Sequence, residues 1–252
     1  MDNFTHSFGQ QTARTLSLRR LLAVIALGLA LSLINVATFA RAKDNAAKPA
    51  SAAKPAGAAK SVDASAPVKT YGSKNAPITL EVFGDYECPS CGAFYETTLR
   101  QMINNEVAAG KVYIVHRDFP LQMHKYGYEA ARWANAAASI GRFAEAESAL
   151  YDNQNYWAES GNIEKYMAAT LSPTDMRHVK ALMVGCEANV PPGSHSCPWD
   201  AYIEQDRAMG NQIPVQATPT FVIYHKGQKF PAGQGVVSYT VLKQFFDQLL
   251  KQ

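Results

Sequence analysis

Residues 78–91, ITLEVFGDYECPSC, contain the most informative structural signal of this chain. Its first half is apolar and rich in β-branched residues, as expected of a buried strand. Its end, Cys88-Pro89-Ser90-Cys91, opens a run to residue 109 in which apolar side chains recur at helical spacing: Tyr95, Leu99, Met102, Ile103 and Val107. The two cysteines are therefore expected where a strand turns into the first turn of a helix.

A cysteine at a helix start loses its proton easily, because unpaired N–H groups and the positive end of the helix dipole converge there. The thiolate is the reactive form. The motif thus predicts a redox site in which Cys88 exchanges disulfides and Cys91, one turn further in, resolves the mixed disulfide. A structural disulfide and half of a zinc site are the alternative interpretations. The sequence contains no second CxxC that would complete a zinc site, and we expect no metal.

The residues between the cysteines have simpler interpretations as well. Pro89 is a candidate, with Ser90, for tuning the Cys88 thiolate, but helix initiation also explains it, because it lacks an N–H group that would be unpaired at a helix start anyway. Ser90 either tunes the Cys88 thiolate through its hydroxyl or caps the helix. A carboxylate under Cys91 could accept its proton during resolution, and Glu81 is the candidate that we favour over Asp85 and Glu87. His124 is interpreted as a helix-start residue.

The N-terminal part predicts export. Residues 21–40 are almost entirely apolar and follow Arg14, Arg19 and Arg20, the pattern of a secretion signal. Residues 40–42, Ala-Arg-Ala, are a candidate cleavage site. A stretch of about 20 apolar residues is also long enough to cross a bilayer. Residues 1–42 are therefore either a cleaved signal peptide or a membrane anchor, and the rest is expected in the periplasm or another extracytoplasmic space.

Composition separates a linker from the folded part. Residues 43–67 are rich in Ala, Lys, Pro and Ser, which predicts a flexible linker or plain disorder after cleavage. Residues 1–67 contain 8 Lys/Arg and 3 Asp/Glu, whereas residues 68–252 contain 16 Lys/Arg and 18 Asp/Glu. Together these make the 24 basic and 21 acidic residues of the whole chain. Because the basic excess lies outside the folded part, nucleic-acid binding has no support.

The remaining pattern predicts one α/β domain over residues 68–252. A second β-rich run at 111–117 makes a strand–helix–strand unit, which requires a parallel crossover. Residues 125–211 read as an inserted block of four or five helices. Strand character returns at 220–224 with a hairpin partner at 229–232, and Ser238 caps a last helix.

Two further cysteines lie within the helical block. Cys88 and Cys91 are close enough to pair with each other, which leaves Cys186 and Cys197 as the natural second pair. An exported chain permits such disulfides. We favour a structural disulfide. A second redox relay and a metal site completed by His195 are the alternatives.

A strand, a CxxC motif at a helix start, a βαβ unit and a later ββα unit together resemble the thioredoxin fold. The helices inserted in its middle make it similar to the DsbA-like thiol:disulfide oxidoreductases. Three stretches carry the resemblance: residues 83–91 around the cysteines, Arg-Asp-Phe-Pro-Leu at 117–121, and Ala-Thr-Pro-Thr-Phe at 217–221. It covers about residues 70–250. Where the strongly oxidising members carry Pro-His between the cysteines, this chain has Pro-Ser, so the strength of oxidation stays open.

The resemblance implies roles for Thr218 and Pro219. The Thr218–Pro219 bond is expected to be cis, which leaves the backbone of Thr218 free to pair with an extended substrate segment. The implied activity is oxidation of cysteines in unfolded or newly exported proteins, without a cofactor. It also implies a membrane quinone-linked reoxidant of the DsbB or vitamin-K-epoxide-reductase type. A reductase or isomerase of the same fold and a non-catalytic metal-binding or holdase module are the alternatives.

Overall fold

The computed structural model describes residues 65–186, 192 and 196–252. The predicted signal or anchor, nearly all of the predicted linker and His195 lie outside the described residues. Within the described part of the chain, no helix is both long and apolar enough to span a bilayer.

The described strands form one mixed sheet. They are β1 (Thr70–Tyr71), β2 (Ile78–Gly84), β3 (Val112–Asp118), β4 (Thr220–His225), β5 (Gln228–Lys229) and β6 (Gly233–Gln234). Their order is β1-β3-β2-β4-β5, and β6 also pairs with β4. β2 and β3 are parallel, as the strand–helix–strand pattern predicts, and β4 runs antiparallel to β2 on the other side. The central strand β2 therefore leads straight into the cysteine motif.

Two details of the sheet differ from the sequence prediction. β1 is only two residues long, so it offers no pattern to detect. The expected partner of β4 at 229–232 is split into β5 and β6. Pro231 interrupts it, since a proline has no N–H to donate to the ladder.

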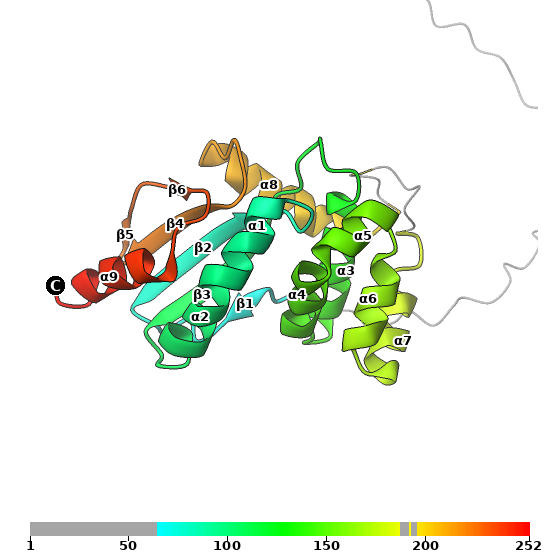
Figure 1. Cartoon of the computed structure of the whole chain (residues 1–252), viewed down its shortest axis with the longest axis horizontal. Coiled ribbons are helices and arrows are strands. Elements are labelled where there is room, and N and C mark those ends of the chain that lie inside the picture. The colour runs from blue at the N-terminus through cyan, green and yellow to red at the C-terminus, as the bar shows by residue number, and fades with distance from the viewer. Residues whose placement is uncertain (1–64, 187–191, 193–195) are drawn as a thin grey trace, which may run out of the picture. The chain divides into compact units, whose positions relative to one another are not determined.

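A long helical run follows the cysteines and covers one face of the sheet. It comprises α1 (Pro89–Phe94), the π-helical turn η1 (Tyr95–Leu99), α2 (Arg100–Met102) and the π-helical turn η2 (Ile103–Val107). In Figure 1, α1 and α2 cross in front of the strands. Together with α9 (Tyr239–Leu249) they bury a shared apolar cluster that includes Leu80, Val82, Phe94, Leu99, Leu242 and Phe246. The first helix is thereby fixed relative to β2.

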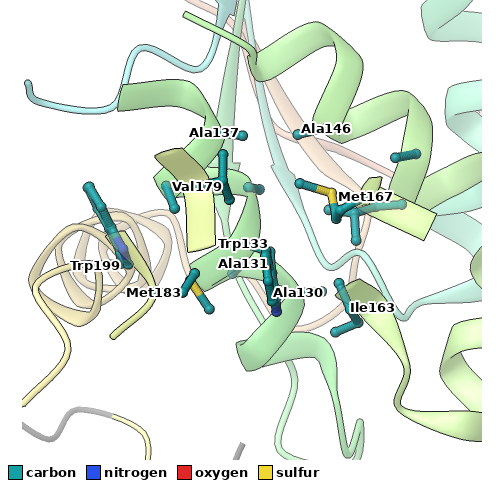
Figure 2. Packing of buried hydrophobic residues seen from close by; sticks show 14 of the residues in the cluster. Ala130, Ala131, Trp133, Ala137, Ala146, Ile163, Met167, Val179, Met183 and Trp199 are labelled. Atoms are coloured by element: carbon teal, nitrogen blue, oxygen red, sulfur yellow. The ribbon is translucent and has the colours of Figure 1, made fainter. Parts of the chain in front are cut away.

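The helical block is inserted between β3 and β4. Its described part contains six helices, one more than the upper expectation: α3 (Gly127–Ser139), α4 (Phe143–Asp152), α5 (Gln154–Ser160), α6 (Ile163–Thr170), α7 (Pro173–Leu182) and α8 (Asp200–Gln212). Alanines of α3 let these helices approach closely, and Trp133, Ile163 and Met167 fill the space between them (Figure 2). The block has its own core, and Tyr151 packs both against it and against the cluster under α1.

Candidate redox site

Cys88 and Cys91 lie at the junction of β2 with α1, as the sequence predicts. Cys88 is the N-cap residue of α1, and Pro89 occupies the first helical position. The Cys88 carbonyl accepts hydrogen bonds from the N–H groups of Cys91 at 2.9 Å and Gly92 at 3.1 Å. The Cys88 N–H donates to the Asp85 carbonyl at 3.1 Å. The turn that carries the motif is therefore held by backbone hydrogen bonds on both sides.

The two sulfur atoms are free thiols in very different electrostatic environments. A hydrogen bond from the Cys91 thiol, aided by backbone N–H groups at the helix start, lowers the pKa of Cys88 to about 5 against the opposing effect of burial. Burial and the neighbouring Cys88 raise the pKa of Cys91 well above its ordinary value. At neutral pH, Cys88 is thus the thiolate and Cys91 keeps its proton.

The loop before β4 brings Thr218 against the cysteines. The Thr218–Pro219 peptide bond is cis. The Thr218 carbonyl lies 3.3 Å from Cys88 Sγ, although 130 positions separate the two residues in the chain. Gly235 N–H donates to the Pro219 carbonyl at 2.8 Å and ties the loop to the end of β6. The structure therefore joins the two sequence-predicted parts of the site.

Glu81 does not lie beside the cysteines. Successive residues of a strand point to opposite faces, and Leu80 and Val82 face the α1 side. Glu81 accepts hydrogen bonds from Arg117 Nε at 2.7 Å and from the Tyr224 hydroxyl at 3.1 Å. This placement does not support Glu81 as the proton acceptor of Cys91. The strand alternation could have revealed this from the sequence.

Asp85 is the carboxylate that belongs to the turn of the two cysteines. Its side chain is fully buried and its backbone N–H points to Cys91 Sγ at 3.5 Å. The carboxylate accepts hydrogen bonds from the Leu121 N–H at 2.8 Å and from the Glu87 N–H at 2.9 Å. His124 Nδ1 lies 2.6 Å from it, so His124 is part of the turn's surroundings and not only a helix-start residue.

Gln154 of α5 is a site residue that sequence reasoning missed. Its side-chain amide is buried and donates to the carbonyls of Tyr86 at 2.6 Å and Cys88 at 2.9 Å. A Cβ atom at Gly92 would meet its Oε1 at 2.6 Å, so glycine is needed for this approach. A lone glutamine 66 residues after Cys88 carries no sequence signal for this role.

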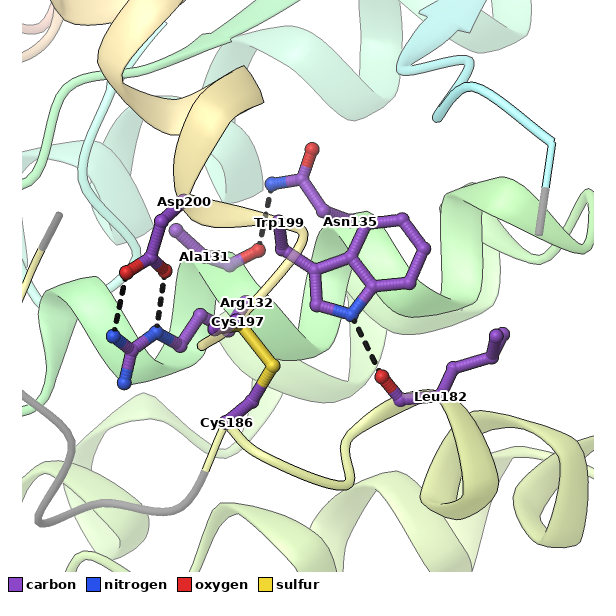
Figure 3. The surroundings of a disulfide bond; sticks show 8 residues. All are labelled: Ala131, Arg132, Asn135, Leu182, Cys186, Cys197, Trp199 and Asp200. Atoms are coloured by element: carbon purple, nitrogen blue, oxygen red, sulfur yellow. Dashed lines mark hydrogen bonds and ion pairs between the residues drawn. A yellow bond between two sulfur atoms is a disulfide. The ribbon is translucent and has the colours of Figure 1, made fainter. Parts of the chain in front are cut away.

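The second cysteine pair lies away from this turn, in the helical block. Cys186 and Cys197 form a disulfide, and both are buried. Figure 3 shows its surroundings: Trp199 Nε1 donates to the Leu182 carbonyl at 3.0 Å, and Arg132 pairs with Asp200 through two hydrogen bonds. In the residues that the structure describes, no cluster of His, Cys, Asp and Glu could hold a metal ion.

The family model described as "Thioredoxin" matches residues 65–234. The chain belongs to this family. Solved thioredoxin-fold structures align over most of its length. Wolbachia pipientis alpha-DsbA1 has a TM-score of 0.57 at 17% identity and covers 72% of this chain and 90% of its own. BdbD from Bacillus subtilis has a TM-score of 0.55 at 19% identity and covers 75% of this chain and 98% of its own. The predicted fold, a thioredoxin fold with inserted helices as in DsbA, is confirmed.

Curated relatives of this thioredoxin-family chain match it at higher sequence identity than these solved structures, but over a smaller part of the chain. Na(+)/H(+) antiporter NhaA 1 of Mycobacterium sp. (strain KMS) is 35% identical over 85 residues, which is 33% of this chain and 13% of the antiporter. The same antiporter of Mycolicibacterium gilvum (strain PYR-GCK) is 29% identical over 168 residues, 64% of this chain and 24% of the antiporter. The matched part thus spans less than a quarter of these relatives.

Proposed function

We propose that this chain is a protein thiol:disulfide oxidoreductase that works through Cys88 and Cys91. One observation carries the proposal: two thiols at a helix start, one with its pKa lowered to about 5 and the other with its pKa raised. A nucleophile and a resolving thiol need this difference. The thioredoxin family and the DsbA-type fold support the same activity.

The exchange begins with a Cys88–Cys91 disulfide and a substrate thiolate. The thiolate attacks Cys88 Sγ, the Cys88–Cys91 bond breaks, and Cys91 leaves with the electron pair and takes up a proton. A second substrate thiolate then attacks the substrate sulfur of the mixed disulfide, and Cys88 leaves as a thiolate. The substrate loses two electrons and forms a disulfide, and the enzyme gains them as a thiol and a thiolate.

The low pKa of Cys88 favours oxidation of substrates over their reduction. A thiol with a low pKa is the better leaving group, and a stabilised thiolate stabilises the reduced enzyme. The alternative of a reductase or isomerase has no comparable support. Backbone atoms of Thr218, 3.3 Å from Cys88 Sγ, would pair with an extended substrate segment during the mixed disulfide.

The proposed setting is outside the cytoplasm. Residues 1–42 would be a cleaved signal or an anchor, residues 43–67 a linker, and residues 68–252 the working domain. Substrates would be unfolded or newly exported proteins with cysteines. A membrane quinone-linked partner of the DsbB or vitamin-K-epoxide-reductase type would restore the disulfide.

The reduction potential of the Cys88–Cys91 pair tests the direction of the reaction. We expect the full-length protein, equilibrated with glutathione redox buffers, to give a value above about −180 mV. A value near that of thioredoxin, about −270 mV, would overturn the oxidase proposal. The double variant Cys88→Ser/Cys91→Ser should lose all oxidation of a reduced, unfolded protein. If cells that carry only this variant keep the full function of the protein, a non-catalytic module is favoured instead.

A further inference from the structure

His124 and Asp85 form a pair directly beside the active-site turn. His124 Nδ1 lies 2.6 Å from Asp85 Oδ2. The Asp85 side chain is fully buried, whereas His124 keeps 16% of its side chain exposed. Asp85 thus holds the imidazole at Nδ1, and a small part of the ring is in contact with solvent.

Asp85 connects this histidine to both cysteines. Its N–H donates to Cys91 Sγ at 3.5 Å, and its carbonyl accepts from the Cys88 N–H at 3.1 Å. The carboxylate itself is held in place by hydrogen bonds from the backbone N–H groups of Glu87 and Leu121. Asp85 therefore holds the cysteine turn and the imidazole by hydrogen bonds at the same time.

Gly127, the first residue of α3, leaves room for the Asp85 carboxylate. A Cβ atom at Gly127 would lie 2.5 Å from Asp85 Oδ1, which is closer than any side chain tolerates. Glu87 accepts a hydrogen bond from the Tyr126 N–H and so joins the same segment to the turn. The loop that carries His124 is thereby attached to the turn at Asp85 and at Glu87.

The charges around His124 favour its protonated form. Asp85, Glu87 and Cys88 face it from the turn, and Lys125 follows it in the chain and is exposed. Burial lowers the pKa of His124, but these three groups outweigh burial, so that its pKa is raised above the ordinary value. The two residues between the cysteines, Pro89 and Ser90, carry no charge.

We propose that His124, held by Asp85, is the positively charged neighbour of Cys88 and stabilises its thiolate. The inference rests on the proposed redox function of Cys88 and assigns the group that tunes it. His124 is a positioning residue that acts through space on Cys88. The energetic coupling between two titrating sites is reciprocal. The proton of His124 is therefore held more tightly when Cys88 is a thiolate than when it is part of a disulfide.

The reciprocal effect can be measured without any change at the site. We expect NMR titration of the full-length protein to give a higher pKa for the His124 imidazole in the reduced form than in the oxidised form. His178, exposed on α7, is the control, and its imidazole signals should not depend on the redox state. Equal values for His124 in the two redox states would overturn the inference.

A pair of matched variants tests the effect on Cys88 itself. His124→Gln keeps an N–H donor for Asp85 and removes the charge, and His178→Gln is the control. In the reduced protein, the pH midpoint of Cys88 alkylation should rise by about one unit in the first variant and stay unchanged in the second. An unchanged midpoint in His124→Gln overturns the inference.

These readouts separate the inference from the proposed function. A shifted midpoint in a protein that does not oxidise substrates would support the role of His124 and overturn the oxidase proposal. Oxidation of substrates by the parent protein, together with an unshifted midpoint in His124→Gln, would support the oxidase proposal and overturn the role of His124. When both hold, His124→Gln should also make the pair more reducing, because its reduced form loses stabilisation.

Discussion

Cys88 and Cys91 show how the neighbours of a side chain decide its chemistry. Both are thiols, both are buried, and only two residues separate them. Cys88 receives hydrogen bonds from the Cys91 thiol and from backbone N–H groups at the helix start, while Cys91 has lost contact with water. The position of Cys88 at the start of the helix, and not its residue type, makes its thiol the more acidic of the two.

The first prediction concerns the reactivity of these thiols. In the reduced protein, the rate of Cys88 alkylation should rise with a midpoint near pH 5 and level off by neutral pH, while Cys91 stays unmodified. Iodoacetamide labelling followed by mass spectrometry measures both rates. Cys91→Ala should move the midpoint upward, since the Cys91 hydrogen bond is the largest stabilising contribution. A parent midpoint near 9 would refute this account.

Among the elements, helix α5 of the insertion contacts the turn that carries the cysteines and stabilises it. Gln154 of α5 donates to two carbonyls of the segment that precedes α1, at Tyr86 and Cys88. The turn is therefore held by the sheet, by its own helix and by the insertion. The insertion therefore has a structural role in the site.

Removing this support should destabilise the protein. Gln154→Ala removes a donor from the Tyr86 carbonyl and leaves the Cys88 carbonyl with only its two backbone donors, which should lower the free energy of unfolding by about 1–3 kcal/mol. Urea unfolding measures the change. Gln101→Ala, at an exposed position of α2, is the control and should be nearly neutral. Equal stability of the two variants would contradict a supporting role for α5.

The disulfide between α7 and α8 should act on stability alone. Cys186 and Cys197 are 11 positions apart, so closing this loop stabilises the folded state by about 3 kcal/mol on the loop-entropy model. Cys186→Ala/Cys197→Ala should lose that amount in urea unfolding and keep its Cys88 alkylation midpoint. Loss of substrate oxidation in a variant that remains folded would instead favour the redox-relay alternative.

At the scale of the whole molecule, buried charges join the sheet to the insertion. Lys69, next to β1, forms ion pairs with Asp118 of β3 and Asp206 of α8. His116 of β3 lies 3.0 Å from Glu147 of α4 and 3.5 Å from Asp118. A buried pair that loses one partner leaves an uncompensated charge, which is strongly destabilising. The two apolar cores are therefore linked by a polar cluster that requires its complete set of partners.

This cluster predicts a loss of stability at alkaline pH. Burial lowers the pKa of His116, but Asp118 and Glu147 outweigh it and raise the pKa from 6.5 to about 9. A raised pKa contributes stability that is fully present below pH 6.5 and is lost as pH rises through about 9. In the oxidised protein, the free energy of unfolding should fall across this window by an amount on the order of 3 kcal/mol.

Chemical denaturation at several pH values measures this fall. His116→Gln should lack it, because glutamine does not titrate, and His178→Gln should keep it. The oxidised form is used because Cys88 and Cys91 then do not titrate and contribute no slope of their own. An identical pH slope in the parent and in His116→Gln would refute the assignment.

Much of the fold was readable from local pattern. The apolar run at 78–84, the helical spacing after Cys91 and the cap at Ser238 correspond to β2, the helix after the cysteines and α9. The single strand predicted at 229–232 is instead split into β5 and β6, because Pro231 has no N–H to donate to the ladder. Strand alternation, applied to Glu81, would have excluded it from the cysteine side.

The amino-acid sequence alone predicts three features: a CxxC motif at a strand–helix junction, a Thr-Pro loop 130 residues later and a second cysteine pair. These depend on residue type and spacing along one chain segment. The folded chain brings Thr218 against Cys88 Sγ, where it adds to the lowering of the pKa of that thiol. It also brings Gln154 to the Cys88 carbonyl and His124 to Asp85, and no local pattern encodes such contacts. The protonation of a thiol depends in part on contacts of this kind, so part of its reactivity is a property of the fold.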